Sequence, residues 1–305
     1  MKYVVTGGAG FIGSNLVDRL VEKGNEVHVI DNFSFGKREN CNEKAFYYNL
    51  DLSQKLNSKD IEKICKNADT VFHLACVARV QPSIQKPVSY EINNTISTVI
   101  LLKACVDAKV RRFVYSSSSS VYGNQLSLPL KESDDTNPLS PYGAQKLYGE
   151  ILCKTFCEVY NLETVCLRYF NVYGERQNLD GAYSLVIGIF LFQRLNSKPL
   201  TIRGNGEQKR DFTYVGDVVN ANILASSSKK VGFGEVINIG NGDNRSINQI
   251  ASYIGGKIKH IDPVLEPFET LADNSKAKRL LNWRPKQNVE LWIKSFIDKK
   301  KNSNF

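Results

Sequence analysis

The stretch Met1-Lys-Tyr-Val-Val-Thr-Gly-Gly-Ala-Gly-Phe-Ile-Gly13 decides the fold. Its apolar start is typical of a buried strand, and its glycines match both the G-x-G-x-x-G and the G-x-x-G-x-x-G spacings. Apolar residues then recur with the period of one helix face, at Leu16, Val17, Leu20 and Val21. Glycine lets backbone approach a pyrophosphate, which the positive end of a helix attracts. We therefore predict a dinucleotide-binding strand, turn and helix; a plain strand-to-helix turn is the alternative.

Strand-like and helical segments alternate behind this opening. The expected strands are Tyr3–Thr6, Glu26–Asp31, Phe46–Asn49, Thr70–Leu74, Arg112–Ser117, Thr164–Arg168 and Glu235–Ile239. The expected helices are Ile12–Lys23, Ile61–Lys66, Val88–Ala108, Tyr142–Tyr160 and Gly216–Ser226. The strands are near-continuous apolar runs, as in parallel sheets that are covered on both faces. This alternation predicts an α/β fold with a Rossmann-type doubly wound parallel sheet.

The pattern changes after Arg168, where Gly, Asn and Pro interrupt the chain and Leu200–Ile202 forms a short strand-like run. We expect residues 1–168 and 212–240 to form the dinucleotide-binding domain. Residues 169–211 and 241–305 are expected to form a smaller C-terminal α/β lobe over the carboxyl edge of the sheet.

The composition is that of a globular protein, with 42% hydrophobic and 23% charged residues. The longest apolar run, Ala182–Phe192, is too short to span a bilayer and is expected to be a core helix, so we expect no membrane partner. The seven cysteines include no Cys-x-x-Cys pair, which favours buried thiols in a cytoplasmic protein over a metal site. The net charge of +9 is scattered apart from Lys299–Lys301, so we expect no nucleic-acid partner.

Two aspartates follow strands of the first half. A carboxylate at Asp31 would accept hydrogen bonds from ribose hydroxyls and repel a 2′-phosphate, which favours NAD over NADP. Lys37 and Arg38 lie slightly downstream and keep NADP as an alternative. Asp51 and the adjoining Leu52 stand where the carboxylate could meet the adenine amino group, although a simple turn explains them equally well.

A tyrosine and a lysine stand one helical turn apart, at Tyr142 and Lys146, behind the helix start Ser140-Pro141. A tyrosine pKa lies near 10, and a nearby ammonium and the positive nicotinamide ring of a bound NAD⁺ favour the phenolate. A serine run, Ser116–Ser120, ends the preceding strand and is expected to line the cofactor crevice. The pair alone is compatible with a surface contact, and the run alone with a polar loop. Together they predict proton transfer beside a dinucleotide.

With these motifs the chain resembles the extended short-chain dehydrogenases/reductases of the nucleotide-sugar epimerase family, close to UDP-glucose 4-epimerases. The resemblance covers nearly the whole chain. Its motifs are Thr6–Gly13, His73–Ala75, Asn93, Ser116–Gly123, Tyr142–Lys146, Arg168–Gly174, Arg210–Val215, Leu271–Asp273 and Leu281–Trp283.

The resemblance implies roles for individual residues. The implied catalytic residues are Ser118, Tyr142 and Lys146. The expected NAD contacts are Gly7, Gly10, Phe11, Ile12, Gly13, Asp31, Asn32, Asp51, Leu52, Leu74, Ala75, Asn93, Ser116, Tyr142, Lys146 and Tyr169. The expected contacts of the UDP-sugar, in the smaller lobe and around the serine run, are Ser83, Ser118, Tyr142, Asn171, Arg210 and Glu266. The two long helices resemble a pair that forms a four-helix bundle in homodimers of this family; monomer core is the alternative.

The implied reaction is inversion at C4 of a UDP-hexose through a transient 4-keto sugar, with NAD as the hydride carrier. Related dehydratases carry Asp-Glu after the catalytic hydroxyl, and related decarboxylases carry Glu. This chain has Ser119 and Ser120 there, which cannot supply the extra acid and base. The alternatives are another nucleotide-sugar enzyme, such as a UDP-uronate epimerase or a reductase, and a non-catalytic NAD-sensing regulator.

The sequence departs from the family at two places. The family usually carries an arginine shortly before the position of Glu266, and this chain has none there; Lys257, Lys259 or His260 is expected to compensate. Thr270 stands where a bulky tyrosine narrows the sugar pocket of some members. The resemblance therefore implies room for a 2-acetamido group, and UDP-GlcNAc and UDP-GalNAc as substrates beside UDP-Glc and UDP-Gal.

Overall fold

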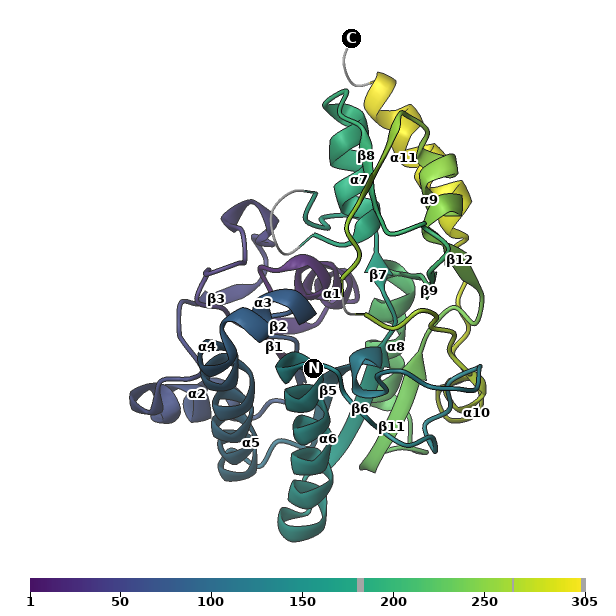
Figure 1. Ribbon diagram of the computed structural model, residues 1–305. Coiled ribbons are helices and arrows are strands. Elements are labelled where there is room, and N and C mark those ends of the chain that lie inside the picture. Colours follow the sequence, from purple (N-terminus) through teal and green to yellow (C-terminus); the bar gives the residue numbers. More distant parts are fainter. Residues whose placement is uncertain (180–183, 265, 303–305) are drawn as a thin grey trace.

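A seven-stranded parallel sheet forms the centre of the computed structural model, which describes residues 1–179, 184–264 and 266–302 (Figure 1). The strand order is β11-β6-β5-β4-β1-β2-β3. The strands are β1 (Lys2–Thr6), β2 (Glu26–Ile30), β3 (Phe46–Tyr48), β4 (Thr70–His73), β5 (Arg112–Ser118), β6 (Glu163–Tyr169) and β11 (Phe233–Ile239). The order reverses between β1 and β4, which opens a crevice at the carboxyl ends of these strands. The predicted α/β doubly wound fold is confirmed.

Helices cover both faces of the sheet and bury its apolar strands. One face packs against α1 (Phe11–Glu22), α8 (Val215–Ser227) and α10 (Ser275–Leu281). The other packs against α2 (Ser58–Cys65), α5 (Ser97–Asp107) and α6 (Pro141–Tyr160). Short helical pieces connect these elements: η1 (Arg38–Asn40), η2 (Lys55–Asn57), α3 (Val80–Gln85), α4 (Pro87–Glu91), η3 (Ile92–Ile96) and η4 (Ser119–Val121).

A second lobe lies beside the carboxyl edge of the sheet (Figure 1). Its strands are β7 (Val172–Tyr173), β8 (Leu200–Arg203), β9 (Lys209–Asp211), β10 (Thr213–Tyr214), β12 (Asn244–Ser246) and β13 (Ile258–Ile261), paired as β7 with β10, β9 with β12 and β8 with β13. Its helices are α7 (Val186–Leu195), α9 (Ile247–Ile254) and α11 (Val289–Asn302). Phe190, Leu200, Ile250 and Trp292 belong to its separate apolar core.

The expected strands and helices all form, with small shifts at their ends. The long helix expected over 88–108 consists of α4, the π-helical turn η3 and α5. The apolar run that begins at Ala182 becomes α7, although its first two residues lie outside the described residues. The domain boundaries stay a prediction. α10, which the sequence assigned to the second lobe, packs on α8 and β11 of the first.

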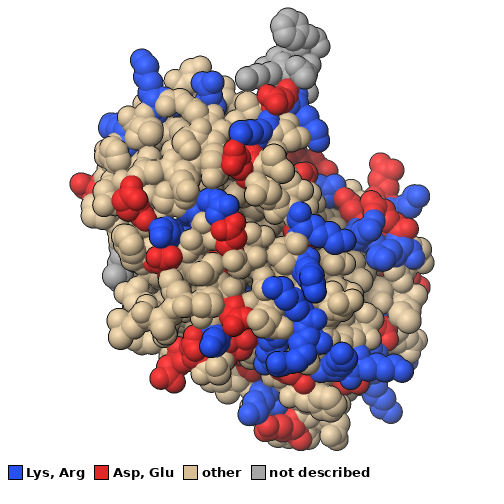
Figure 2. All heavy atoms as spheres, turned by 90° about the vertical axis from the view of Figure 1, so that its right-hand side faces the viewer, with Lys and Arg blue, Asp and Glu red and all other residues tan. Residues whose placement is uncertain are grey.

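The surface carries basic side chains away from the crevice. Figure 2 faces the side of the molecule with α10 and shows Lys and Arg gathered on its lower part. Lys278 and Arg279 belong to the last turn of α10 and are exposed. The net charge of +9 is therefore not a property of the crevice alone. Among the described residues, no helix has the length and apolarity that crossing a bilayer demands.

Candidate active site

A cavity of about 810 Å³ extends from the carboxyl ends of β1, β2, β4 and β5 to the second lobe. Its walls contain most of the residues that the sequence singled out. These are Gly7, Gly10, Phe11, Ile12, Gly13, Asp31, Asn32, Asp51, Leu52, Leu74, Ala75, Asn93, Ser116, Ser118, Tyr142, Tyr169, Asn171, Arg210 and Glu266. Two other expected site residues, Ser83 and Lys146, are buried behind this wall. The fold thus brings the predicted residues together, while their roles stay predictions.

The glycine turn forms a cradle in which a side chain has no room. The Gly10 N–H donates to the Gly7 carbonyl at 3.1 Å, and Gly7 has a φ of 68°. A β-carbon on Gly13 would lie 2.1 Å from the Gly7 carbonyl oxygen. The chain therefore turns tightly into α1, and the positive end of this helix faces the cavity, as pyrophosphate binding requires.

Asp31 follows β2, and each of its two carboxylate oxygens accepts a hydrogen bond from a backbone amide. The Ala9 N–H donates to its Oδ2 at 2.9 Å, and the Phe33 N–H donates to its Oδ1 at 2.8 Å. The side chain is buried and borders the cavity. Its remaining lone pairs can accept from ribose hydroxyls. Asp51 also borders the cavity and accepts from the N–H and the hydroxyl of Ser53.

Helix α6 carries Tyr142 and Lys146 on one side. The Ser140 hydroxyl accepts the Gly143 N–H at 3.1 Å and Pro141 is the first helical residue, as predicted. The buried Ser83 hydroxyl accepts the Tyr142 N–H at 3.2 Å. Ser83 thus holds the start of the helix from behind, and its hydroxyl does not border the cavity.

The phenol of Tyr142 faces the cavity, whose wall also contains Ser118, at the end of β5. The Lys146 ammonium donates to the Ser116 carbonyl at 2.8 Å and lies 5.9 Å from the centre of the Tyr142 ring. Burial raises the pKa of Tyr142 above its usual value, whereas the Ser118 hydroxyl and the Arg79 charge lower it. Burial is the largest of these influences, so the charges of the protein alone do not make this phenol acidic.

The opposite end of the cavity contains Arg210, whose guanidinium lies 2.9 Å from the Glu266 carboxylate. The Asn171 side chain donates to the Asp211 carbonyl at 3.0 Å. The buried Asp211 carboxylate accepts backbone N–H groups of Asn241, Gly242 and Ala272, so it ties the segments around this end together.

The cation that borders the cavity near the position of the missing arginine belongs to another strand. Lys257, Lys259 and His260 are exposed and do not border the cavity. Arg203, at the end of β8, does border it and is paired in register with Ile261. Lys257, Lys259 and His260 are therefore not placed to compensate, because none of them borders the cavity.

A sequence model for the NAD dependent epimerase/dehydratase family matches residues 3–240. The chain belongs to this family. Among solved structures it resembles the UDP-N-acetylglucosamine 4-epimerase of Methanobrevibacter ruminantium M1 in complex with UDP-N-acetylmuramic acid, with 38% identity, a TM-score of 0.92 and coverage of 99% and 98% of the two chains. It resembles the UDP-glucose 4-epimerase of Thermotoga maritima with UDP-glucose at 35% identity, a TM-score of 0.93 and full coverage of both chains.

A third solved structure, the UDP-glucuronic acid 4-epimerase of Bacillus cereus in complex with UDP-glucuronic acid and NAD, shares 36% identity with the chain. The TM-score is 0.89, and 99% of this chain and all of the other are covered. The protein is thus an enzyme of the NAD dependent epimerase/dehydratase family, and its cofactor is NAD. The glycine cradle and the amide-held Asp31 fit this dinucleotide.

Two buried polar groups of this family member were missed by the sequence analysis. Asn94, in η3, bonds both polar groups of the Val77 backbone, at 2.7 and 3.0 Å. The Arg168 guanidinium donates two hydrogen bonds to Glu150, beneath the serine run. Neither Asn94 nor Glu150 belongs to a local pattern that reveals its partner, because the contacts join distant segments. Only Arg168 belongs to a motif that the sequence singled out, the stretch Arg168–Gly174.

Proposed function

We propose that the protein inverts C4 of a UDP-hexose through a transient 4-keto sugar. The observation that carries this proposal is that Tyr142 and Ser118 line the same cavity, with Lys146 one turn behind the tyrosine. NAD⁺, when bound, supplies the hydride acceptor and donor. Tyr142 takes the proton of the 4-hydroxyl and later returns it, and Ser118 hydrogen-bonds the same sugar oxygen.

The acidic groups of the cavity favour oxidation and re-reduction over dehydration. Among the lining residues that the structure describes, the carboxylates are Asp31, Asp51 and Glu266. The first two follow strands on the expected adenosine side, and Glu266 pairs with Arg210. The positions after Ser118 are serines, so a second acid and base for eliminating water are lacking beside the phenol.

We also propose that the sugar pocket accepts a 2-acetamido group. Thr270 borders the cavity, and its hydroxyl accepts the Asp211 N–H at 3.4 Å. Its side chain is smaller than the tyrosine that narrows this place in the resembled enzymes. The likeness to a UDP-N-acetylglucosamine 4-epimerase supports the same substrate class. The likeness to a UDP-glucuronic acid 4-epimerase makes a UDP-uronate the alternative substrate.

A panel of UDP-sugars tests the proposal. The purified protein is incubated without added NAD with UDP-Glc, UDP-Gal, UDP-GlcNAc, UDP-GalNAc and UDP-glucuronate, and products are identified by NMR. We expect C4-inverted product without net cofactor consumption, and a loss of roughly 10²-fold or more in Tyr142→Phe. Tyr160→Phe, at the exposed end of the same helix, should retain turnover. Normal turnover of Tyr142→Phe would refute the role of the phenol.

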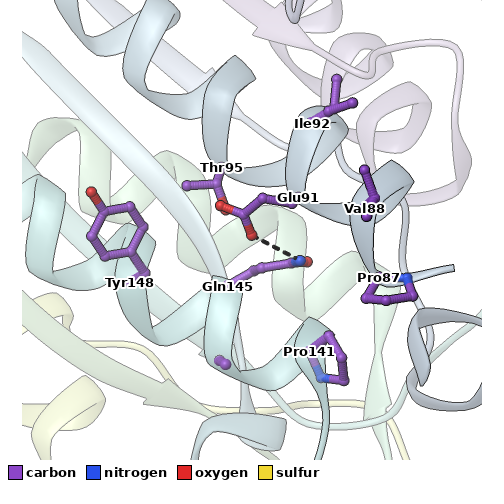
Figure 3. A pocket seen from close by; sticks show the side chains of 9 residues that line it. Pro87, Val88, Glu91, Ile92, Thr95, Pro141, Gln145 and Tyr148 are labelled. Atoms are coloured by element: carbon purple, nitrogen blue, oxygen red, sulfur yellow. Dashed lines mark hydrogen bonds between the residues drawn. The ribbon is translucent and has the colours of Figure 1, made fainter.

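We further propose that two copies pair through the outer faces of α4, η3 and α6. Val88 and Ile151 are 72% and 54% exposed there, and Ile92 and Tyr148 are also exposed. Figure 3 shows Val88, Ile92 and Tyr148 around a surface groove between these helices. Such an apolar stripe is typical of an interface. Light scattering should give twice the chain mass, and Ile151→Glu should give one chain mass; a monomeric parent protein would contradict the pairing.

A further inference from the structure

Arg79, the residue before the first turn of α3, has an unusual backbone conformation. Its backbone has φ 114° and ψ 137°, a region that residues with a β-carbon rarely adopt. Its side chain borders the same cavity as Tyr142. Glycine would adopt this backbone without strain. An arginine in this conformation must be held by its surroundings, and strain of this kind gathers at functional sites.

The residues before Arg79 are held by buried polar contacts. The Val77 N–H donates to Asn94 Oδ1 at 2.7 Å, and Asn94 Nδ2 donates back to the Val77 carbonyl at 3.0 Å. The Tyr90 hydroxyl donates to the Ala78 carbonyl at 3.0 Å. The backbone that leads into Arg79 therefore has little freedom to relax.

The same contacts attach this loop to α6. Asn94 Nδ2 also donates to Gln145 Oε1 at 3.0 Å, and Gln145 in turn donates to Glu91 at 3.1 Å (Figure 3). Ser83, four residues beyond Arg79, accepts the Tyr142 N–H. Arg79 and Tyr142 thus lie on two elements that are joined at several points.

We propose that Arg79 is a positioning residue that acts through Tyr142, its guanidinium holding a second positive charge against the phenol in addition to that of Lys146. This inference rests on the proposed role of Tyr142 as the base. Lys146 lies behind the cavity wall on the helix of Tyr142, whereas Arg79 approaches from the loop after β4 and borders the cavity. The contacts of Val77 and Ala78 hold this strained backbone in place, and from it the Arg79 side chain borders the cavity.

The other groups around the phenol make this charge important. Burial raises the pKa of Tyr142, and Cys76 and Tyr90 add to that effect, while Ser118 and Arg79 oppose it. Burial lowers the pKa of Arg79 itself to about 10, so the guanidinium stays charged near neutral pH. Among the described residues, the titratable or charged groups that interact with Tyr142 include Cys76, Arg79, Tyr90, Tyr115 and Lys146.

The test is the pH profile of kcat in the NAD-loaded enzyme and its Arg79→Gln, Arg79→Lys and Arg79→Gly variants. An opposite charge beside an ionisable group lowers its pKa by about one unit or more. Arg79→Gln should therefore move the acid limb to higher pH by about one unit, with about tenfold lower turnover on that limb. Arg79→Lys should stay near the parent profile. Arg79→Gly should melt at the same or a higher temperature, yet show the displaced limb.

Two comparisons make the outcome decisive. Arg279→Gln removes the same charge from the exposed last turn of α10 and should leave the profile unchanged. Phenolate absorbance is titrated in each holoenzyme, and the absorbance of its Tyr142→Phe counterpart is subtracted, so that the difference follows Tyr142 independently of activity. An unchanged phenolate titration and acid limb in Arg79→Gln would overturn the inference. Normal turnover of Tyr142→Phe would instead overturn the proposed function, so the two failures are distinguishable.

Discussion

The buried pair of Glu150 and Arg168 should be the most costly polar contact to break. Arg168 Nε and Nη2 donate to the two carboxylate oxygens at 2.9 and 2.7 Å, and each side chain is only 4% exposed. The Ser117 hydroxyl donates to the same carboxylate, and the guanidinium lies 4.6 Å from the centre of the Tyr122 ring. The pair therefore joins α6, β5 and β6 directly below Ser118.

Glu150→Ala leaves the guanidinium buried without its anion, which costs about 3–5 kcal/mol. In a chain of this size each kcal/mol lowers Tm by a few degrees, so a fall of about 10 °C is expected. Arg168→Met should cost a similar amount, because it leaves the carboxylate unpaired. The double variant Glu150→Met/Arg168→Met removes both charges and should cost clearly less than the sum of the two single changes.

Urea unfolding followed by fluorescence of the buried Trp283 and Trp292 measures these free energies. Lys154→Ala, an exposed change on the same helix, serves as the control and should lie within about 0.5 kcal/mol of the parent. A cost of Glu150→Ala below about 1 kcal/mol, or strict additivity in the double variant, would refute this reasoning.

Three further changes probe other parts of the site. Gly13→Ala should yield protein without retained NAD, because the new β-carbon would lie 2.1 Å from the Gly7 carbonyl oxygen; NAD released on denaturation measures this, and a normal content would contradict it. Thr270→Tyr should lower the ratio of UDP-GalNAc to UDP-Gal turnover at least about tenfold in competition assays, and an unchanged ratio would end the acetamido proposal. Burial lowers the pKa of His73 to about 3 in the folded protein. In the unfolded chain this imidazole has its ordinary pKa of about 6.5 and takes up a proton below that pH, so the free energy of unfolding decreases as the pH is lowered. Between pH 7 and pH 5 the free energy of unfolding should decrease by about 2 kcal/mol less in His73→Gln than in the parent protein. Equal decreases in the two proteins would refute the role of His73.

Local chemistry made much of the fold predictable. The glycine spacing fixed the turn into α1, and Ser140-Pro141 marked the start of α6, where the Ser140 hydroxyl does cap the helix. Near-continuous apolar strands indicated a sheet covered on both faces, which the helices on each side confirm. These features depend on residues that are close in sequence, so they can be predicted from a single sequence.

Contacts between distant segments were not predictable in the same way. Nothing beside Asn94 in the sequence indicates that it would insert into a π-helical turn to hold Val77. The cation that borders the cavity near the expected position of the missing arginine is Arg203, on a strand that the sequence did not connect with that position. The positive φ of Arg79 was equally hidden, because the residue type argues against that conformation.

The fate of the hydrogen on C4 tests the central claim most directly. The enzyme is incubated in D₂O with the UDP-hexose that it turns over, without added NAD, and the product is analysed by NMR and mass spectrometry. If C4 is oxidised and re-reduced within one closed site, the inverted product retains its original hydrogen at C4 and contains no solvent deuterium there. Deuterium at C4 of the product would show that this carbon exchanges a proton with water, and it would contradict the account.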